Sequence, residues 1–499
     1  MEFNFDTRII DKVAKEIKEA EKYVRIAIFQ IHNGSIYDAL DYALQKKVAV
    51  EVFTLPYDSI NADIRDKVKN RMEGIRRNGA KLYFSNWGIG DPERTTTAVG
   101  RWYSFHGKFL VTDKAAISIS ANLTNDPELD AMLVYREKEK IDEFNEKFKL
   151  LVEWFNNENG KIKSIIEKTD YNDKETLFLA PRTINDPEVK SHWIRDYPSQ
   201  MCKTINTIKD GLYISPFEWR ARDLVEKIIN EAKEYVYIST ESFTDTDIIQ
   251  ILINNSIKGK TIRILTNSES QDFNDRIREL YPRLMANKIE LKKPRDPLHA
   301  KLIITDRRLV VSSVNLNKMN LGYSKKKALW RANTETITVE SNHDIIEKAK
   351  LNYEEIFKDS ISLLDYLSEK ETDYAVSIFS VYEIKPEKEV KELFSRFIVL
   401  SDIKLKKNLY LIGKYASILV KKFNKSETTI KKQDFFCAMV LYFLSDRKHT
   451  EQELKEKLSE IYYDIDIKSI IRRLLEHNLI TKNEDFYQLS VEKLLGEPK

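Results

Sequence analysis

The 499-residue sequence is poor in cysteine, in long apolar runs and in net charge. Its two cysteines, Cys202 and Cys437, lie far apart without a metal-ligand spacing, which argues against a disulfide framework and a zinc site. The longest apolar stretch, FFCAMVLYFL from Phe435 to Leu444, is too short to span a bilayer. The first residues lack the basic segment and apolar run of a secretion signal. These absences predict a cytoplasmic protein without stable membrane insertion.

The formal net charge is only +3 at pH 7, so the overall charge neither requires nor excludes a polyanionic partner. Any affinity for nucleic acid must therefore come from local patches of charge. The composition, with 42% hydrophobic and 32% charged residues, is that of an ordinary globular protein. A chain of this length exceeds a single hydrophobic core, and we expect several domains.

The sequence contains an internal repeat in which equivalent residues lie 212 positions apart. AEKYVRIAIFQ, from Ala20, aligns with AKEYVYISTES, from Ala232, and the same register superposes VEVFT, from Val50, on IRILT, from Ile262. Each copy alternates helical and β-rich segments. We predict two pseudo-symmetric α/β domains, residues 1–158 and 212–360, packed face to face about a pseudo-twofold axis and joined by a connector over residues 159–211.

One polar motif occurs at equivalent places in the two copies. Both read His-x-Lys-x4-Asp, and after six further residues each is followed by a serine and, two positions later, an asparagine. On a strand alternate side chains share a face, so histidine and lysine project together, as do serine and asparagine. Two chance matches at equivalent places of one repeat are far less frequent than a single chance match, so the motif indicates a functional site. The residues are His106, Lys108, Asp113, Ser120 and Asn122 in the first copy and His299, Lys301, Asp306, Ser313 and Asn315 in the second.

Paired histidines and lysines suit the cleavage or transfer of a phosphodiester. A neutral imidazole can attack phosphorus while a protonated imidazole on the opposite side protonates the leaving oxygen, so the two histidines make one site. The lysines and asparagines would donate to the non-bridging oxygens, where negative charge accumulates in the transition state. This division of roles requires neither a metal nor another cofactor.

The repeated motif resembles the signature of the phospholipase D superfamily, and the resemblance covers roughly residues 8–360. It implies a covalent phosphohistidine without a metal, with His106 as nucleophile and His299 as acid. In similar proteins an acidic residue downstream of the asparagine orients each histidine, and the matching positions are Asp130 and Glu335. For Asp113 and Asp306 two roles stay open, securing a loop or touching the substrate.

Both copies depart from the superfamily pattern in the same way. Ile119 and Ser312 replace the glycine usual before the motif serine, and the gap that precedes them is five residues instead of six. Departures shared by both copies indicate a divergent branch and not a decayed site.

The superfamily contains nucleases as well as enzymes that act on phospholipids. A segment from Ser85 to Phe105 precedes only the first motif, and its Arg94, Arg101 and Trp102 would suit contact with a nucleic-acid strand, although a packed Ω-loop explains it equally well. We predict a metal-independent endonuclease, with DNA favoured over RNA. The alternative is a phospholipase D or phosphatidyltransferase that acts on phospholipids.

Residues 366–499 are predicted to form a separate, mainly helical domain. Thr450 and Glu453 have the spacing of a capping box, and a following helix from Ile467 to His477 carries Arg472 and Arg473. Two β-like runs then flank the turn Asn483-Glu484-Asp485. This order resembles a winged helix, in which the two arginines would contact DNA. A partner protein or a homodimer contact through this domain is the other expectation.

Overall fold

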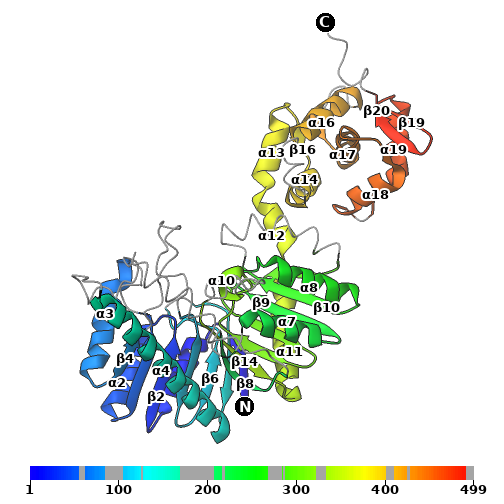
Figure 1. Ribbon diagram of the computed structural model, residues 1–499. Coiled ribbons are helices and arrows are strands. Elements are labelled where there is room, and N and C mark those ends of the chain that lie inside the picture. The colour runs from blue at the N-terminus through cyan, green and yellow to red at the C-terminus, as the bar shows by residue number, and fades with distance from the viewer. Residues whose placement is uncertain are drawn as a thin grey trace. The chain divides into compact units, whose positions relative to one another are not determined.

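The computed structural model describes residues 1–55, 62–84, 105–124, 127–168, 207–215, 218, 220–267, 284, 287–321, 333–400, 409–423, 428–462 and 464–490. The chain divides into two compact units, whose elements are labelled in Figure 1. The first unit comprises Met1–Phe273 with Asn287–Ser360, and the second comprises Asn274–Ala286 with Ile361–Lys499.

The first half of the first unit is built on a seven-stranded sheet with the order β1-β7-β6-β5-β2-β3-β4. β2, β3 and β4 are parallel, whereas β5, β6, β7 and β1 join by antiparallel pairing. The strands are β1 (Glu2–Asp6), β2 (Tyr23–Ile28), β3 (Ala49–Thr54), β4 (Lys81–Phe84), β5 (Lys108–Thr112), β6 (Ala116–Ile119) and β7 (Asp130–Tyr135). The helices are α1 (Ile9–Glu19), α2 (Gly34–Gln45), α3 (Ala62–Arg77) and α4 (Lys138–Lys168).

The second half repeats this topology, as the sequence repeat predicted. Its strands run in the order β11-β10-β9-β12-β13-β14-β8, with β9, β10 and β11 parallel and the others antiparallel. The strands are β8 (Gly211–Ser215), β9 (Tyr235–Thr240), β10 (Thr261–Thr266), β11 (Glu290–Lys293), β12 (Leu302–Thr305), β13 (Leu309–Ser312) and β14 (Glu335–Glu340). The helices are α7 (Ala221–Glu231), α8 (Thr246–Ile257), α10 (Lys318–Leu321) and α11 (His343–Asp359).

The two halves share one hydrophobic core, which confirms the predicted duplicated α/β fold. On β5, Phe109 and Val111 enter this shared core together with Leu302 and Ile304 of β12. Leu110, between them, points to the opposite face and packs in a separate core with α1, α2 and α3. Because both faces of the strand are covered, it reads as a continuous apolar run. The packing fixes the N-terminal ends of β5 and β12, where the motif histidines lie.

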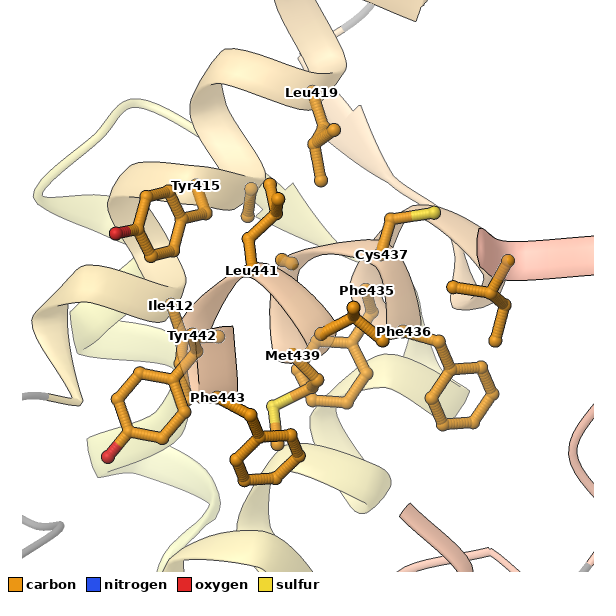
Figure 2. Close-up of a cluster of buried hydrophobic side chains, with 14 of the residues drawn as sticks. Ile412, Tyr415, Leu419, Phe435, Phe436, Cys437, Met439, Leu441, Tyr442 and Phe443 are labelled. Atoms are coloured by element: carbon orange, nitrogen blue, oxygen red, sulfur yellow. The ribbon is translucent and has the colours of Figure 1, made fainter. Parts of the chain in front are cut away.

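The second unit is mainly helical and encloses its own core. Its helix α17 (Lys432–Leu444) is buried from Asp434 to Leu444, and Figure 2 shows its side chains projecting in all directions into the cluster. The apolar run Phe435–Leu444 is therefore a core helix enclosed by protein. Among the helices that the structure describes, none combines the length and apolar character needed to cross a membrane.

The elements of the second unit include those predicted near its C-terminus. The capping box of Thr450 and Glu453 forms, and the following hairpin has Glu484 in a left-handed conformation at its turn. A three-stranded sheet has the order β18-β20-β19. The helices are α12 (Leu363–Lys370), α13 (Thr372–Ser380), α14 (Lys388–Leu400), α16 (Tyr410–Phe423), α17, α18 (Glu451–Ser459) and α19 (Ile467–Glu476), and the strands are β15 (Ile361–Ser362), β16 (Lys385–Pro386), β17 (Thr429–Ile430), β18 (His449–Thr450), β19 (Ile480–Asn483) and β20 (Phe486–Leu489).

Candidate active site

The first motif histidine is held by the second half of the unit. His106 lies just before β5, and its backbone N–H donates to the carbonyl of Thr334 at 2.7 Å. Its Nδ1 lies 3.0 Å from Oε2 of Glu335, the first residue of β14. The Ser313 hydroxyl donates to the same carboxylate oxygen. A carboxylate on Nδ1 fixes the orientation of the imidazole and leaves Nε2 for chemistry.

The second motif histidine is held by the first half in the same way. The backbone N–H of His299 donates to the carbonyl of Leu129 at 3.1 Å, and its Nδ1 lies 3.1 Å from Oδ1 of Asp130. The Ser120 hydroxyl donates to that carboxylate oxygen at 2.7 Å. The predicted serines thus hold the predicted carboxylates, and each carboxylate orients the histidine of the opposite half.

The predicted hydrogen-bond donors lie beside the two imidazoles. Nζ of Lys108 lies 3.2 Å from Nε2 and 3.4 Å from Nδ1 of His106. Nδ2 of Asn122, from the first half, lies 3.3 Å from Nε2 of His299 in the second half. Lys108 and Lys301 are both buried. Amide and ammonium donors beside the reactive nitrogens suit the binding of the non-bridging oxygens of a phosphodiester.

Burial and neighbouring charges lower the pKa values of His106 and Lys108. Burial lowers the pKa of His106 to about 4, and the charge of Lys108 adds to this effect while Glu335 opposes it. Burial and the charge of Lys301 lower the pKa of Lys108 to about 7. His106 is therefore an uncharged imidazole at neutral pH, as a nucleophile must be.

The second half contains an acidic residue that the sequence did not single out. Glu241 follows β9, and its Oε2 lies 3.1 Å from Nζ of Lys301 and accepts a hydrogen bond from Nδ2 of Asn315 at 3.2 Å. The same oxygen lies 3.8 Å from Nε2 of His299. Although burial raises it, the charges of Lys301 and His299 lower the pKa of Glu241 below its ordinary value, so it is a carboxylate at neutral pH.

The repeat itself is the signal that could have identified Glu241. The residue 212 positions earlier is Phe29, which follows β2 in the first half. Its ring packs edge-on to His106 with centroids 4.9 Å apart, and Nζ of Lys108 lies 5.7 Å from its centroid. A change from phenylalanine to glutamate beside a motif lysine marks the position as functional. Asn320 was also missed: it donates to Glu335 and lies 3.4 Å from Nδ1 of His106.

Of the two roles left open for Asp113 and Asp306, the contacts in the structure favour the securing of a loop. Asp113 accepts hydrogen bonds from the backbone N–H groups of Glu21 and Lys22, both at 3.0 Å. Asp306 accepts the equivalent bonds from Lys233 and Glu234 at 2.8 and 3.1 Å. Both aspartates follow the C-terminal ends of β5 and β12, whereas the histidines precede the N-terminal ends. They secure the loops that lead into β2 and β9.

Of the two arginines predicted to contact nucleic acid on α19, one pairs within the second unit. The guanidinium of Arg473 lies 2.7 Å from Oδ1 of the buried Asp434 and 4.2 Å from the ring centroid of Phe423, so it is taken up in the packing of the second unit. Arg472, one residue earlier on α19, is exposed. Arg94, Arg101 and Trp102 lie outside the described residues.

One cluster in this site has the composition of a metal site. Within the described part of the chain, Glu128, Asp130 and His299 are the group of three whose potential ligand atoms lie within 4.8 Å of one another. The His299 atom that faces both carboxylates is Nδ1, which lies 4.0 Å from Glu128 and 3.1 Å from Asp130. The same atoms therefore serve the histidine–carboxylate pair described above.

Two histidines on carboxylate partners, with two lysines between the halves of a duplicated α/β fold, define a class of phosphodiester-acting enzymes. The chain belongs to the phospholipase D-like family: the model described as "Cardiolipin synthase, PLD-like domain" matches residues 13–152 and 225–358, together more than half of the chain. No curated protein matches the sequence.

Several solved structures resemble this one in fold. Phosphatidylserine synthase of Haemophilus influenzae is 11% identical over 72% of this chain and 87% of its own, with a TM-score of 0.49. Polyphosphate kinase of Porphyromonas gingivalis is 14% identical over 69% of this chain, which spans only 45% of the kinase, with a TM-score of 0.42. NucT of Helicobacter pylori is 18% identical over 31% of this chain and 99% of its own, with a TM-score of 0.26.

Proposed function

We propose that this protein is a metal-independent nuclease that cleaves phosphodiesters through a covalent phosphohistidine on His106. The observation that carries the proposal is the unequal charge around the two imidazoles. His299 has two carboxylates within 4.0 Å of its Nδ1, from Asp130 and Glu128, whereas Nδ1 of His106 has the carboxylate of Glu335 at 3.0 Å. The mechanism requires the acid to carry a proton, and a histidine beside two carboxylates suits that role, whereas burial lowers the pKa of His106 and keeps it neutral.

The reaction follows from these two states. His106 Nε2 attacks phosphorus, the bond to the leaving oxygen breaks, and His299 gives its proton to that oxygen. His299, now neutral, takes a proton from water, whose oxygen attacks the phosphohistidine and breaks the P–N bond. His106 is thereby regenerated, and His299 is again protonated. Lys108, Lys301, Asn122 and Asn315 hold the non-bridging oxygens during both steps.

The second unit supports nucleic acid as the substrate. Its order α17-β18-α18-α19-β19-β20 is that of a winged helix, in which the helix equivalent to α19 enters the major groove. Lys468 and Arg472 are exposed on α19 and lie four residues apart, on one face of the helix. We propose that these two residues contact the phosphate backbone.

A phospholipid-directed phosphatidyltransferase or phospholipase is the second candidate. The observation that favours it is the matching family model, whose description names cardiolipin synthase. The same catalytic residues would serve either substrate, since both contain a phosphodiester.

The deciding experiment offers the full chain duplex DNA, single-stranded DNA, RNA and phosphatidylglycerol vesicles, each in excess EDTA, with His106→Ala as the inactive control. We expect cleavage of nucleic acid, DNA foremost, and none of the lipid. Lipid turnover alone would replace the nuclease proposal, and a requirement for metal would overturn the mechanism.

The role of α19 is tested by the double variant Lys468→Ala/Arg472→Ala. Loss of two phosphate contacts should weaken DNA binding and reduce the slope of log K against log salt by about 2. The matched control is Lys385→Ala/Lys388→Ala, which removes two exposed lysines of the same unit outside α19. Equal losses in the two double variants would contradict a specific role for α19.

A further inference from the structure

The Glu241 carboxylate occupies the half-site that the mechanism reserves for substrate. A single oxygen, Oε2, contacts Nζ of Lys301 at 3.1 Å and Nδ2 of Asn315 at 3.2 Å. It also lies 3.8 Å from Nε2 of His299. These are the donors proposed above to hold a non-bridging phosphate oxygen and to protonate the leaving group. A carboxylate carries the same single negative charge as a phosphodiester.

The first half shows that this contact is not a general feature of the fold. At the equivalent position Phe29 presents a ring to Lys108, so no carboxylate follows β2 there. The contact in the second half therefore depends on the residue at position 241. The lysine and asparagine donors themselves occur in both halves.

We propose that Glu241 acts as an internal substitute for substrate phosphate: it covers Lys301 and Asn315 in the free enzyme and is displaced when a phosphodiester binds. The inference rests on the phosphate-binding role proposed for Lys301 and Asn315, and it names Glu241 as a specificity-determining residue. Only a ligand with further contacts outside this half-site binds strongly enough to displace it. The substrate class is accordingly a polymer or another large diester, and small anions are selected against.

Burial explains why the exchange is one anion for another. The Lys301 side chain is fully buried, and a buried charge without a partner is strongly unfavourable. The Glu241 side chain is 43% exposed, so it can turn toward solvent as the phosphate arrives. Lys301 is thereby paired both before and after substrate binds.

The test measures the affinity of the full chain for inorganic phosphate by calorimetry, in the wild type and in Glu241→Gln. The substitution keeps the size of the side chain and removes its charge. We expect phosphate to bind on the order of tenfold more tightly, because a competing anion beside the binding groups is gone. The KM for bis(4-nitrophenyl) phosphate should fall in parallel, with a smaller change in the KM for the polymeric substrate.

The matched control is Glu128→Gln, which removes an equal charge near His299, on the Nδ1 side of the ring. We expect a gain in phosphate affinity of less than about twofold, since this carboxylate faces Nδ1 of His299 and not the donors that Glu241 covers, and the effect of a charge falls with distance. Glu241→Ala provides a second variant, and thermal unfolding checks that all variants fold. An unchanged affinity in both Glu241 variants, or an equal gain in Glu128→Gln, would overturn the proposal.

The outcomes separate this inference from the proposed function. Phosphate binding is measured without turnover, so a gain in Glu241→Gln supports the internal substitute even if the protein fails to cut nucleic acid. Cleavage of nucleic acid without that gain leaves the nuclease intact and removes the role of Glu241. A loss of kcat in Glu241→Gln at unchanged phosphate affinity would instead make Glu241 a base in the reaction, and the proposal would be wrong.

Discussion

In the first half of the active site a phenylalanine packs against the motif histidine, whereas in the second half the equivalent residue is a glutamate that pairs with the motif lysine. Strand order, motif spacing and the serine–carboxylate–histidine chain are the same in both halves. The duplication thus preserves the donors, and the residues around them differ in charge. Under the proposed mechanism, the two equivalent imidazoles serve one as nucleophile and the other as acid.

The largest expected effect comes from removing either imidazole and using a substrate whose leaving group needs no proton. His106→Ala should lose about 10³-fold or more of turnover on bis(4-nitrophenyl) phosphate, with no initial burst of nitrophenolate. His299→Ala should also turn over slowly but still release one nitrophenolate per site, because His106 can form the phosphohistidine. Stopped-flow absorbance distinguishes the two, and a burst only in His106→Ala would reverse the roles.

The two crossed carboxylates offer the next comparison. Glu335→Gln and Asp130→Asn should each lower kcat by about 10- to 100-fold, as expected for groups that orient a reacting histidine. Asp130→Asn removes the carboxylate that orients the proposed acid, His299, so its effect should be larger on alkyl than on nitrophenyl diesters. Glu335→Gln acts on the nucleophile and should affect both alike. Equal leaving-group dependence in the two variants would contradict the assignment.

Much of this site follows from the sequence, because a repeat with a polar motif places the motif twice on one scaffold. The duplicated α/β fold and the Thr450 capping box were predicted from the repeat and from local rules. The crossing of Asp130 and Glu335 could not be predicted, since it depends on how the two halves pack. The ion pair of Arg473 could not be predicted for the same reason: its partner Asp434 lies 39 positions earlier, on another helix.

The lowered pKa of Lys108 should make activity depend on pH. The pKa of Lys108 is lowered to about 7, so its ammonium is charged below that pH and is lost as the pH rises through it. Because the charge holds the phosphate, kcat/KM should fall above about pH 7. Lys108→Arg keeps its charge and should shift this decline to higher pH, despite a lower maximum. Lys301→Arg retains Lys108 and should leave the decline in place; a shift in both variants would argue against Lys108 as its cause.

A smaller effect, on stability, is expected at the residue between the motif histidine and lysine. This residue is Gly107 in the first half and Ala300 in the second. A Cβ on Gly107 would lie 2.7 Å from both Cζ of Phe105 and Cγ2 of Thr336, whereas the methyl group of Ala300 is accommodated in the core. Gly107→Ala should lower the free energy of unfolding by about 1–3 kcal/mol and disturb His106. Ala300→Gly should cost about 1 kcal/mol. Urea-induced unfolding measures both, and a neutral Gly107→Ala would show that Phe105 can move aside.

The smallest expected effect is one in which the two halves should agree. Asp113 accepts two backbone hydrogen bonds from the residues just before β2, and Asp306 accepts the two equivalent bonds just before β9. Replacement by alanine leaves those N–H groups to water, so each variant should lose about 1 kcal/mol of stability, as on removing a helix cap. Because both carboxylates lie at the ends of the strands opposite the histidines, kcat/KM should not change. A loss of kcat/KM in only one of the variants would show that this aspartate contributes to catalysis and that the two loops are not equivalent.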